Sequence, residues 1–114
     1  MNAADFAHEW IDAWNAHDLE RILSHYRDDF EMSSPYIARI TGEPSGTLRG
    51  KAAVGAYWKK GLERMPELHF ELLSTHVGVN SIALYYKAVG GRLAVEVMTL
   101  DENGKVSRAH AHYA

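Results

Sequence analysis

The chain has 114 residues, of which 46% are hydrophobic and 24% charged, a length that suits one compact domain and excludes two. Its 12 lysines and arginines and 15 aspartates and glutamates give a formal net charge of -3 with no run of either sign, which argues against a nucleic-acid partner. Cysteine is absent, which excludes disulfides, thiolate metal sites and a cysteine nucleophile.

Targeting, membrane and cofactor motifs are missing from the sequence. Residues 1–6 show neither a basic region nor an apolar stretch of signal-peptide length, and no segment approaches the roughly 18 apolar residues of a membrane span. There is also no G-x-G-x-x-G motif, no phosphate-binding loop and no ligand set with metal spacing. We therefore expect a soluble, cytoplasmic protein without a cofactor and with neither a nucleic-acid nor a membrane partner.

Apolar residues at helical spacing predict two consecutive helices at the start of the chain. The first has an aromatic inner face, formed by Phe6, Trp10, Ala13, Trp14 and His17. Asp18 is a typical N-cap for a second, shorter helix, which the spacing extends to Tyr26. The polar residues 27–29 end this second helix.

A short strand and a long loop follow. Alternation from Phe30 to Ser34 predicts a strand that Pro35 stops, because proline cannot donate to a sheet ladder. Ser34 then points the same way as Phe30. Glycine, proline and serine recur between residues 36 and 50, which predicts a surface loop there, and loops of that length often serve as lids.

The second half of the chain changes from a helical to a strand pattern. A third helix is predicted from Lys51, with Pro66 closing it. Four β-rich runs then cover residues 68–77, 81–89, 93–100 and 106–113, and turn-forming residues separate them. Three helices followed by an antiparallel meander predict a single α+β domain in which the helices cover one face of the sheet.

Several short motifs carry a resemblance to a known superfamily. They are residues 10–18 followed by 26–30, residues 48–50 opening the helix that holds Tyr57 and Trp58, and the final strand begun by residues 104–106. Together they resemble the nuclear transport factor 2 (NTF2)-like fold, which includes the SnoaL-like proteins and the ketosteroid isomerases. The resemblance implies a cone-shaped domain with three N-terminal helices in a curved sheet and an apolar pocket at the wide end. Isomerases, dehydratases, cyclases and non-catalytic binders share that fold, so the reaction stays open.

Glu96 is the central candidate residue. It lies eight residues before the hairpin glycine Gly104, where ketosteroid isomerases carry an aspartate on the penultimate long strand. The resemblance implies a protonated acid that donates a hydrogen bond to a substrate oxyanion. Ala94 and Met98 share the parity of Glu96, so the pattern also predicts a desolvated carboxyl with a raised pKa. In the alternative, Val95 and Val97 face the core, and Glu96 on the opposite face points into water.

The remaining site residues come from the same resemblance. The tyrosine partners of the isomerase acid fall on Trp10 and Trp58, and the general base falls on Ser34, whose hydroxyl cannot abstract a proton at a useful rate near neutral pH. We therefore assign Glu96 as the acid and Ser34 as a polar contact. The predicted ligand-binding residues are Trp10, Trp14, Tyr26, Trp58, Tyr86, Met98 and Tyr113. Plain core packing is the alternative for the tryptophans, and Tyr85 is the alternative to Tyr86.

His110 and His112 form an H-x-H pair on the last strand and could bind a metal ion. No third ligand accompanies them, so we predict no metal site. We expect them on the outer sheet face, either solvated or in a homodimer interface with Val95 and Val97. The sequence predicts a protein with a small-molecule pocket, such as an isomerase, dehydratase or cyclase that acts on an apolar carbonyl or hydroxyl compound. The alternatives are a non-catalytic ligand-binding protein and a dimeric interaction protein.

Overall fold

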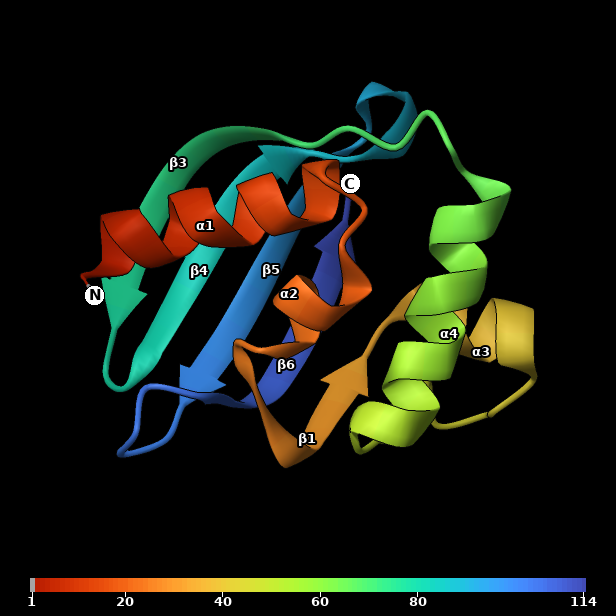
Figure 1. Cartoon of the computed structure of the whole chain (residues 1–114), viewed down its shortest axis with the longest axis horizontal. Coiled ribbons are helices and arrows are strands. Elements are labelled where there is room, and N and C mark those ends of the chain that lie inside the picture. The colour runs from red at the N-terminus through yellow and green to blue at the C-terminus, as the bar shows by residue number, and fades with distance from the viewer. Residues whose placement is uncertain (1) are drawn as a thin grey trace.

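A curved six-stranded sheet carries helices on one of its faces, as a computed structural model of residues 2–114 shows (Figure 1). In chain order the elements are α1 (Ala3–Asn15), α2 (Leu19–Leu23), β1 (Tyr26–Ser33), α3 (Pro35–Thr41), β2 (Thr47–Arg49), α4 (Lys51–Arg64), β3 (Glu71–Gly78), β4 (Ser81–Lys87), the short 3-10 helix η1 (Val89–Gly91), β5 (Leu93–Leu100) and β6 (Val106–Tyr113). The α+β class predicted from the sequence is confirmed.

The strands follow the order β2-β1-β6-β5-β4-β3. Neighbouring strands are antiparallel except for β1 and β6, which run parallel. This parallel pair brings the first and last strands of the chain together in the middle of the sheet (Figure 1). The predicted antiparallel meander is therefore confirmed for β3 to β6, and β1 and β2 extend it at the β6 edge.

The two N-terminal helices begin at side-chain caps. The Asn2 side-chain oxygen accepts the backbone N–H of Asp5 at the start of α1, and the Asp18 carboxylate accepts that of Arg21 at the start of α2. The predicted cap at Asp18 is therefore confirmed. The predicted end of this helix at Tyr26 is wrong: α2 ends at Leu23, and Tyr26 opens β1 because it pairs with Val106 of β6.

The continuous loop predicted for residues 36–50 is wrong, because it contains α3 and β2. Ser34 caps α3 by accepting the backbone N–H of Tyr36, and Pro35 stands in the first turn, where its missing N–H costs no helical hydrogen bond. Gly42 ends the helix with a φ of 79°, a left-handed conformation that favours glycine. β2 then pairs antiparallel with the second half of β1.

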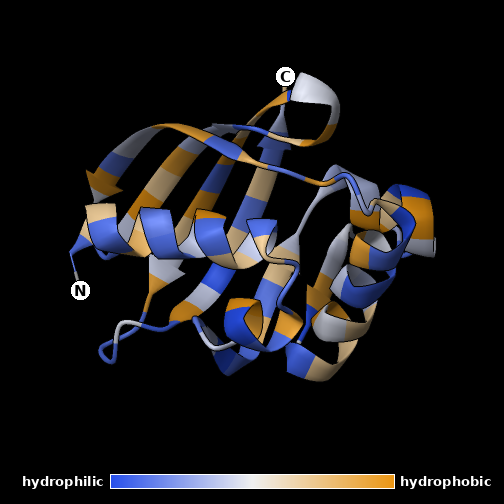
Figure 2. Cartoon of the chain, turned by 45° about the horizontal axis from the view of Figure 1, so that its top comes forward, coloured by the Kyte–Doolittle hydropathy of each residue, from blue (hydrophilic) through white to orange (hydrophobic). Residues whose placement is uncertain are grey.

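The core lies between the helices and the sheet and is rich in aromatic rings. Along the strands, hydrophobic and hydrophilic residues alternate, as expected for a sheet with one covered face (Figure 2). The side chain of Asn15, the last residue of α1, ties this helix to the segment before β3: its Nδ2 donates to the carbonyl of Phe70, and its Oδ1 accepts the N–H of Phe70. Within residues 2–114, no helix is both long and apolar enough to cross a membrane.

Candidate functional site

Glu96 lies on β5 with its side chain turned toward the helices, and only 2% of it is exposed. Its neighbours of the same parity, Ala94 and Met98, are buried too, whereas Val95 and Val97 on the opposite face are only partly buried. The predicted parity is confirmed, and the alternative in which Glu96 faces water is wrong.

The carboxyl of Glu96 has one hydrogen-bond partner among the described residues. The phenol of Tyr86 donates to Oε1 at 3.2 Å. Burial disfavours the charged carboxylate and raises the pKa of Glu96 to about 7, while the bond from Tyr86 stabilises the carboxylate and opposes part of that rise. At neutral pH this acid therefore exists in both protonation states.

Strand register explains how Tyr86 reaches Glu96. In the β4–β5 ladder, Leu84 is the direct partner of Glu96, and Tyr86 is the partner of Ala94. Tyr86 is thus the diagonal neighbour of Glu96 on the same face, a spacing that a long aromatic side chain bridges. The sequence predicted that Tyr86 rather than Tyr85 faces inward, and this is confirmed because Tyr86 is buried and Tyr85 is not. The bond to Glu96 was not predicted.

The phenols of Tyr26, Tyr86 and Tyr113 lie near this acid on three different strands. Burial, and next the negative charge of Glu96, raise the pKa of each well above its ordinary value, while the Ser34 hydroxyl opposes part of the rise at Tyr113. All three phenols therefore keep their protons at neutral pH and can act as hydrogen-bond donors.

Trp10 does not contact the acid through its indole nitrogen. Its Nε1 donates to the hydroxyl of Tyr26 at 2.9 Å, and that hydroxyl lies 3.9 Å from the sulfur of Met98. The isomerase resemblance placed Trp10 beside the acid as its donor partner. In the structure Tyr86 is the residue that donates a hydrogen bond to Glu96, and Trp10 instead donates one to Tyr26.

The predicted ligand-binding tryptophans join these tyrosines in one aromatic cluster. Trp14 of α1 meets Trp58 of α4 edge to face, with ring centroids 5.1 Å apart, and Trp58 meets Tyr26 at 5.2 Å. Phe70 stacks on Trp10 at 5.9 Å and contacts Tyr86 at 4.9 Å. Sequence analysis missed Phe70, which precedes β3 and showed no pattern of its own. We call Trp10, Trp14, Tyr26, Trp58, Phe70 and Tyr86 the aromatic cluster.

Ser34 and Tyr113 lie toward one end of this interior. The hydroxyl of Ser34 is committed to the cap of α3, where it accepts the N–H of Tyr36 at 3.2 Å. Tyr113 is half-buried and packs edge to face on Tyr36 with centroids 4.8 Å apart. The guanidinium of Arg92 lies over both of these rings, at 5.5 Å from Tyr36 and 5.3 Å from Tyr113, and donates to the Tyr36 hydroxyl. At this end the exposed Arg92 therefore covers the rings of Tyr36 and Tyr113.

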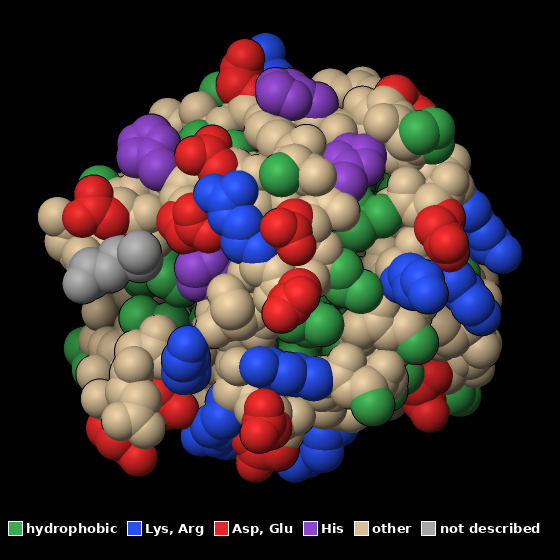
Figure 3. All heavy atoms as spheres, in the orientation of Figure 1, with side chains coloured by type: hydrophobic (Ala, Val, Ile, Leu, Met, Phe, Trp, Pro, Cys, Tyr) green, Lys and Arg blue, Asp and Glu red, His purple; other side chains and the backbone are tan. Residues whose placement is uncertain are grey.

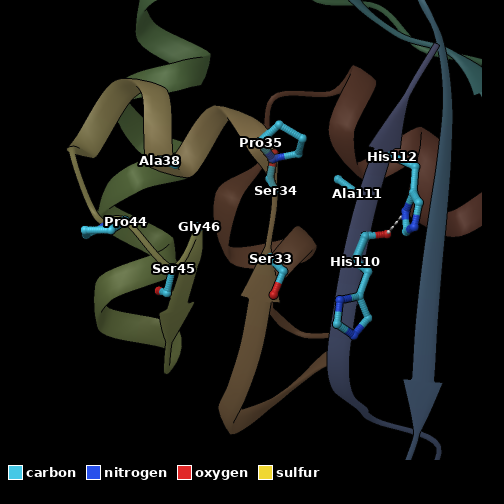
Figure 4. A pocket seen from close by; sticks show the side chains of 10 residues that line it. All are labelled: Ser33, Ser34, Pro35, Ala38, Pro44, Ser45, Gly46, His110, Ala111 and His112. Atoms are coloured by element: carbon cyan, nitrogen blue, oxygen red, sulfur yellow. Dashed lines mark hydrogen bonds between the residues drawn. The ribbon is translucent and has the colours of Figure 1, made fainter.

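Two surface cavities lie away from Glu96. One, of about 390 Å³, lies where the end of β1, α3 and the loop after α3 meet the end of β6, and its lining includes Ser33, Ser34, His110 and His112 (Figure 4). The other, of about 640 Å³, lies at the start of α1 beside the β3–β4 and β5–β6 turns. Neither is lined by Glu96. On the helix-covered face, hydrophobic side chains reach the surface in the middle of the view, among charged ones (Figure 3).

The outer sheet face carries the H-x-H pair. The two side chains project from β6, and His112 Nδ1 lies 3.3 Å from the carbonyl oxygen of His110 (Figure 4). Across residues 2–114, no group of three or more histidine, aspartate or glutamate side chains is arranged to hold a metal ion. On β5, Val97 is the direct neighbour of His110 and Val95 of His112, so an apolar strip adjoins the histidines.

A curved six-stranded sheet that carries four α-helices, one more than the three predicted from the sequence, is the architecture of the NTF2-like proteins. Within that class, the family model for the SnoaL-like domain matches residues 7–113, and the chain belongs to the SnoaL-like family. Among proteins of curated function, none matches the chain.

Solved structures agree with this assignment. A SnoaL-like protein of unknown function from Burkholderia thailandensis is 58% identical, covers 98% of this chain and 93% of its own, and superposes with a TM-score of 0.97. A candidate isomerase of the SnoaL-like family from Agrobacterium tumefaciens is 14% identical, with 98% and 97% coverage and a TM-score of 0.77. AclR, a candidate hydroxylase from Streptomyces galilaeus, is 20% identical, with 99% and 77% coverage and a TM-score of 0.75. The last two likenesses concern the fold alone.

Proposed function

We propose that the protein binds a small apolar carbonyl or hydroxyl compound in the aromatic cluster and acts on it as an isomerase or dehydratase. Glu96 is the acid. The observation that carries the proposal is a carboxyl buried among aromatic side chains, with a single phenol donating to it. An acid with a pKa of about 7 is well matched to proton transfer at neutral pH, since both of its forms are populated.

One carboxyl can perform such chemistry because it can return the proton that it takes. In an isomerisation, the Glu96 carboxylate removes a proton from the carbon next to the carbonyl and returns the same proton to another carbon of the conjugated system. In a dehydration, the protonated acid gives its proton to the departing hydroxyl, which leaves as water, and the carboxylate then takes a proton from the neighbouring carbon. In both cases Tyr86 stabilises the carboxylate by its hydrogen bond.

The other residues of the cluster bind rather than react. Indole and phenol rings offer flat apolar surfaces for a conjugated ligand, and the Tyr26 hydroxyl is a further donor for its oxygen. Ser34 stays a polar contact at the end of the site, because its oxygen already caps α3. Since Glu96 and the rings of Trp10 and Tyr86 are buried, the proposal implies that the aromatic side chains move apart when a ligand enters.

Proton exchange tests this function without knowledge of the natural substrate. With 1-tetralone in deuterated water, the protein should speed the loss of the proton signal at the carbon next to the carbonyl. Glu96→Gln should abolish this acceleration, whereas the control Glu63→Gln, at an exposed position of α4, should retain it. Exchange at the uncatalysed rate together with saturable binding would contradict catalysis.

A non-catalytic binding protein is the second candidate, and one observation favours it. Within residues 2–114, the side chains that contact Glu96, Tyr86 and Trp10 include no second ionisable group other than tyrosines, which hold their protons tightly. Many proton-transfer enzymes separate acid and base between two groups. Tight binding of a ligand that is recovered chemically unchanged would support this second candidate.

A further inference from the structure

Near the start of α1, part of the helix-facing side of the sheet is exposed. Val77 on β3 is the direct partner of Ile82 on β4, so both side chains lie on this side of the sheet. Ile82 is buried, but Val77 is 73% exposed, because it lies near the end of β3, beyond the part of the sheet that α1 crosses (Figure 1). An apolar part of the sheet therefore stays open at this end.

A cavity of about 640 Å³ lies at this open end. Its apolar lining includes Phe6 of α1, Ile82 and Leu100, and Val77 continues this lining to the surface. Val77, Ile82 and Leu100 belong to the neighbouring strands β3, β4 and β5, and we call these three residues the apolar strip. Since neighbouring strands lie about 4.8 Å apart, the apolar strip is roughly 10 Å long. It therefore suits an extended aliphatic chain of about eight carbon atoms, in a cavity large enough for a small molecule.

The polar part of the lining carries a positive charge. Lys105, in the β5–β6 turn, donates from Nζ to the backbone carbonyl of Ser24 at 2.7 Å, which holds its ammonium group at the cavity. An ammonium group has three N–H donors, so two remain for a ligand. Asn80 and Asn103 add side-chain amides to the same lining. Within residues 2–114, no aspartate or glutamate lines the cavity and none forms an ion pair with Lys105, so the charge of this site matches an anion.

The acidic side chains close to this lining are engaged with other groups. Asp101, in the same turn as Lys105, accepts the backbone N–H of Lys105 at 2.9 Å. Glu9 of α1 accepts hydrogen bonds from the guanidinium of Arg21 and lies 3.2 Å from the ring nitrogen of His25, a residue that lines the cavity. The ammonium group of Lys105 therefore stays available to an anion that enters the cavity.

We propose that this cavity binds a small amphipathic anion, a monocarboxylate with an unbranched aliphatic chain of about eight carbon atoms. Its carboxylate accepts charge-assisted hydrogen bonds from the ammonium group of Lys105. Its chain covers the apolar strip and removes that surface from water, which favours binding. Glu96 does not line the cavity, so this site is separate from the aromatic cluster and goes beyond the proposed function.

Three small probes test the charged and the apolar part of this site separately. Octanoate has both the chain and the charge, 1-octanol has the chain alone, and butyrate has the charge with a short chain. In a ¹H–¹³C spectrum near neutral pH, the methyl signals of Ile82 and Leu100 should shift with octanoate and reach saturation. Octanoate should bind more tightly than 1-octanol because of Lys105. Butyrate should bind about tenfold or more weakly than octanoate, because it buries less apolar surface.

Substitutions at exposed lysines test the role of the charge. Lys105→Met keeps an unbranched side chain and removes the ammonium group, so octanoate should bind about fivefold more weakly and 1-octanol as tightly as before. Lys105→Arg should keep the preference for octanoate. The matched control Lys59→Met, at an exposed position of α4, should bind both probes like the native protein. Glu96→Gln should abolish the proton exchange of the proposed function and leave octanoate binding unchanged, so that each idea can fail without the other.

Three results would overturn the inference. Methyl signals of Ile82 and Leu100 that do not shift with octanoate would show that the cavity does not take the chain. Octanoate that binds no more tightly than 1-octanol, or a preference that survives in Lys105→Met, would remove the carboxylate from Lys105. A shift of the Trp58 indole signal in place of the Ile82 and Leu100 signals would place octanoate in the aromatic cluster and not in this cavity.

Discussion

The burial of Glu96 should make the stability of the protein depend on pH in a defined direction. The folded pKa of about 7 lies above the ordinary value of 4.5, so the folded state holds the proton more tightly than the unfolded chain. The stabilisation is therefore complete below pH 4.5 and is lost as the pH rises through 7. The difference between the two pKa values corresponds to about 3 kcal/mol.

Glu96→Gln removes this dependence while keeping the shape of the side chain and an oxygen that Tyr86 can donate to. Urea unfolding at several pH values would give the free energy of unfolding of both proteins. We expect the native value, relative to that of Glu96→Gln, to fall by about 3 kcal/mol between pH 4.5 and pH 8. The histidines and the ion-paired Glu9, whose pKa Arg21 lowers to about 2, are common to both proteins and cancel in the difference. A difference that stays constant or rises with pH would refute the reasoning.

Three further predictions concern single contacts. Tyr86→Phe removes the one hydrogen bond that lowers the pKa of Glu96, so the carboxyl should titrate at a higher pH than in the native protein when followed by NMR. Asn15→Ala breaks both bonds to the backbone of Phe70 and should reduce the free energy of unfolding in urea by about 2 kcal/mol, and an unchanged midpoint would count against this link. If the outer sheet face forms the homodimer interface predicted from the sequence, Val97→Asp should convert the dimer to a monomer in sedimentation experiments, and a native protein that is already monomeric at high concentration would rule out that interface.

The direction of Glu96 was predictable because strand alternation carries over directly into the structure. The apolar residues Ala94 and Met98 indicated which side chains of β5 face the helices. The same alternation on β4 indicated that Tyr86 rather than Tyr85 faces inward. The contacts between these side chains were not predictable. The bond from Tyr86 to Glu96 depends on the β4–β5 register, which two separate strand patterns do not define.

The errors of the sequence analysis also have physical causes. Tyr26 fits the apolar spacing of α2, but pairing with β6, far away in the sequence, draws it into β1. The segment 36–50 is rich in turn-forming residues, yet Ser34 and Gly42 cap a helix within it, and local composition does not show that both caps are used. The helical spacing of Trp10 and Trp14 was evident from the sequence. Within residues 2–114, however, the Trp10 N–H finds an acceptor in Tyr26 and the Trp14 N–H finds none, and this difference depends on where Tyr26 lies in the fold.

The most direct test of the account is the titration of Glu96 itself. The side-chain carboxyl carbons of the glutamates would be followed by ¹³C NMR across the pH range, with the Glu96 resonance assigned by its loss in Glu96→Gln. The account predicts a midpoint near pH 7, well above the ordinary value of 4.5 for a glutamate. A midpoint close to that ordinary value would show a hydrated carboxyl and would contradict the buried acid on which the proposed function rests.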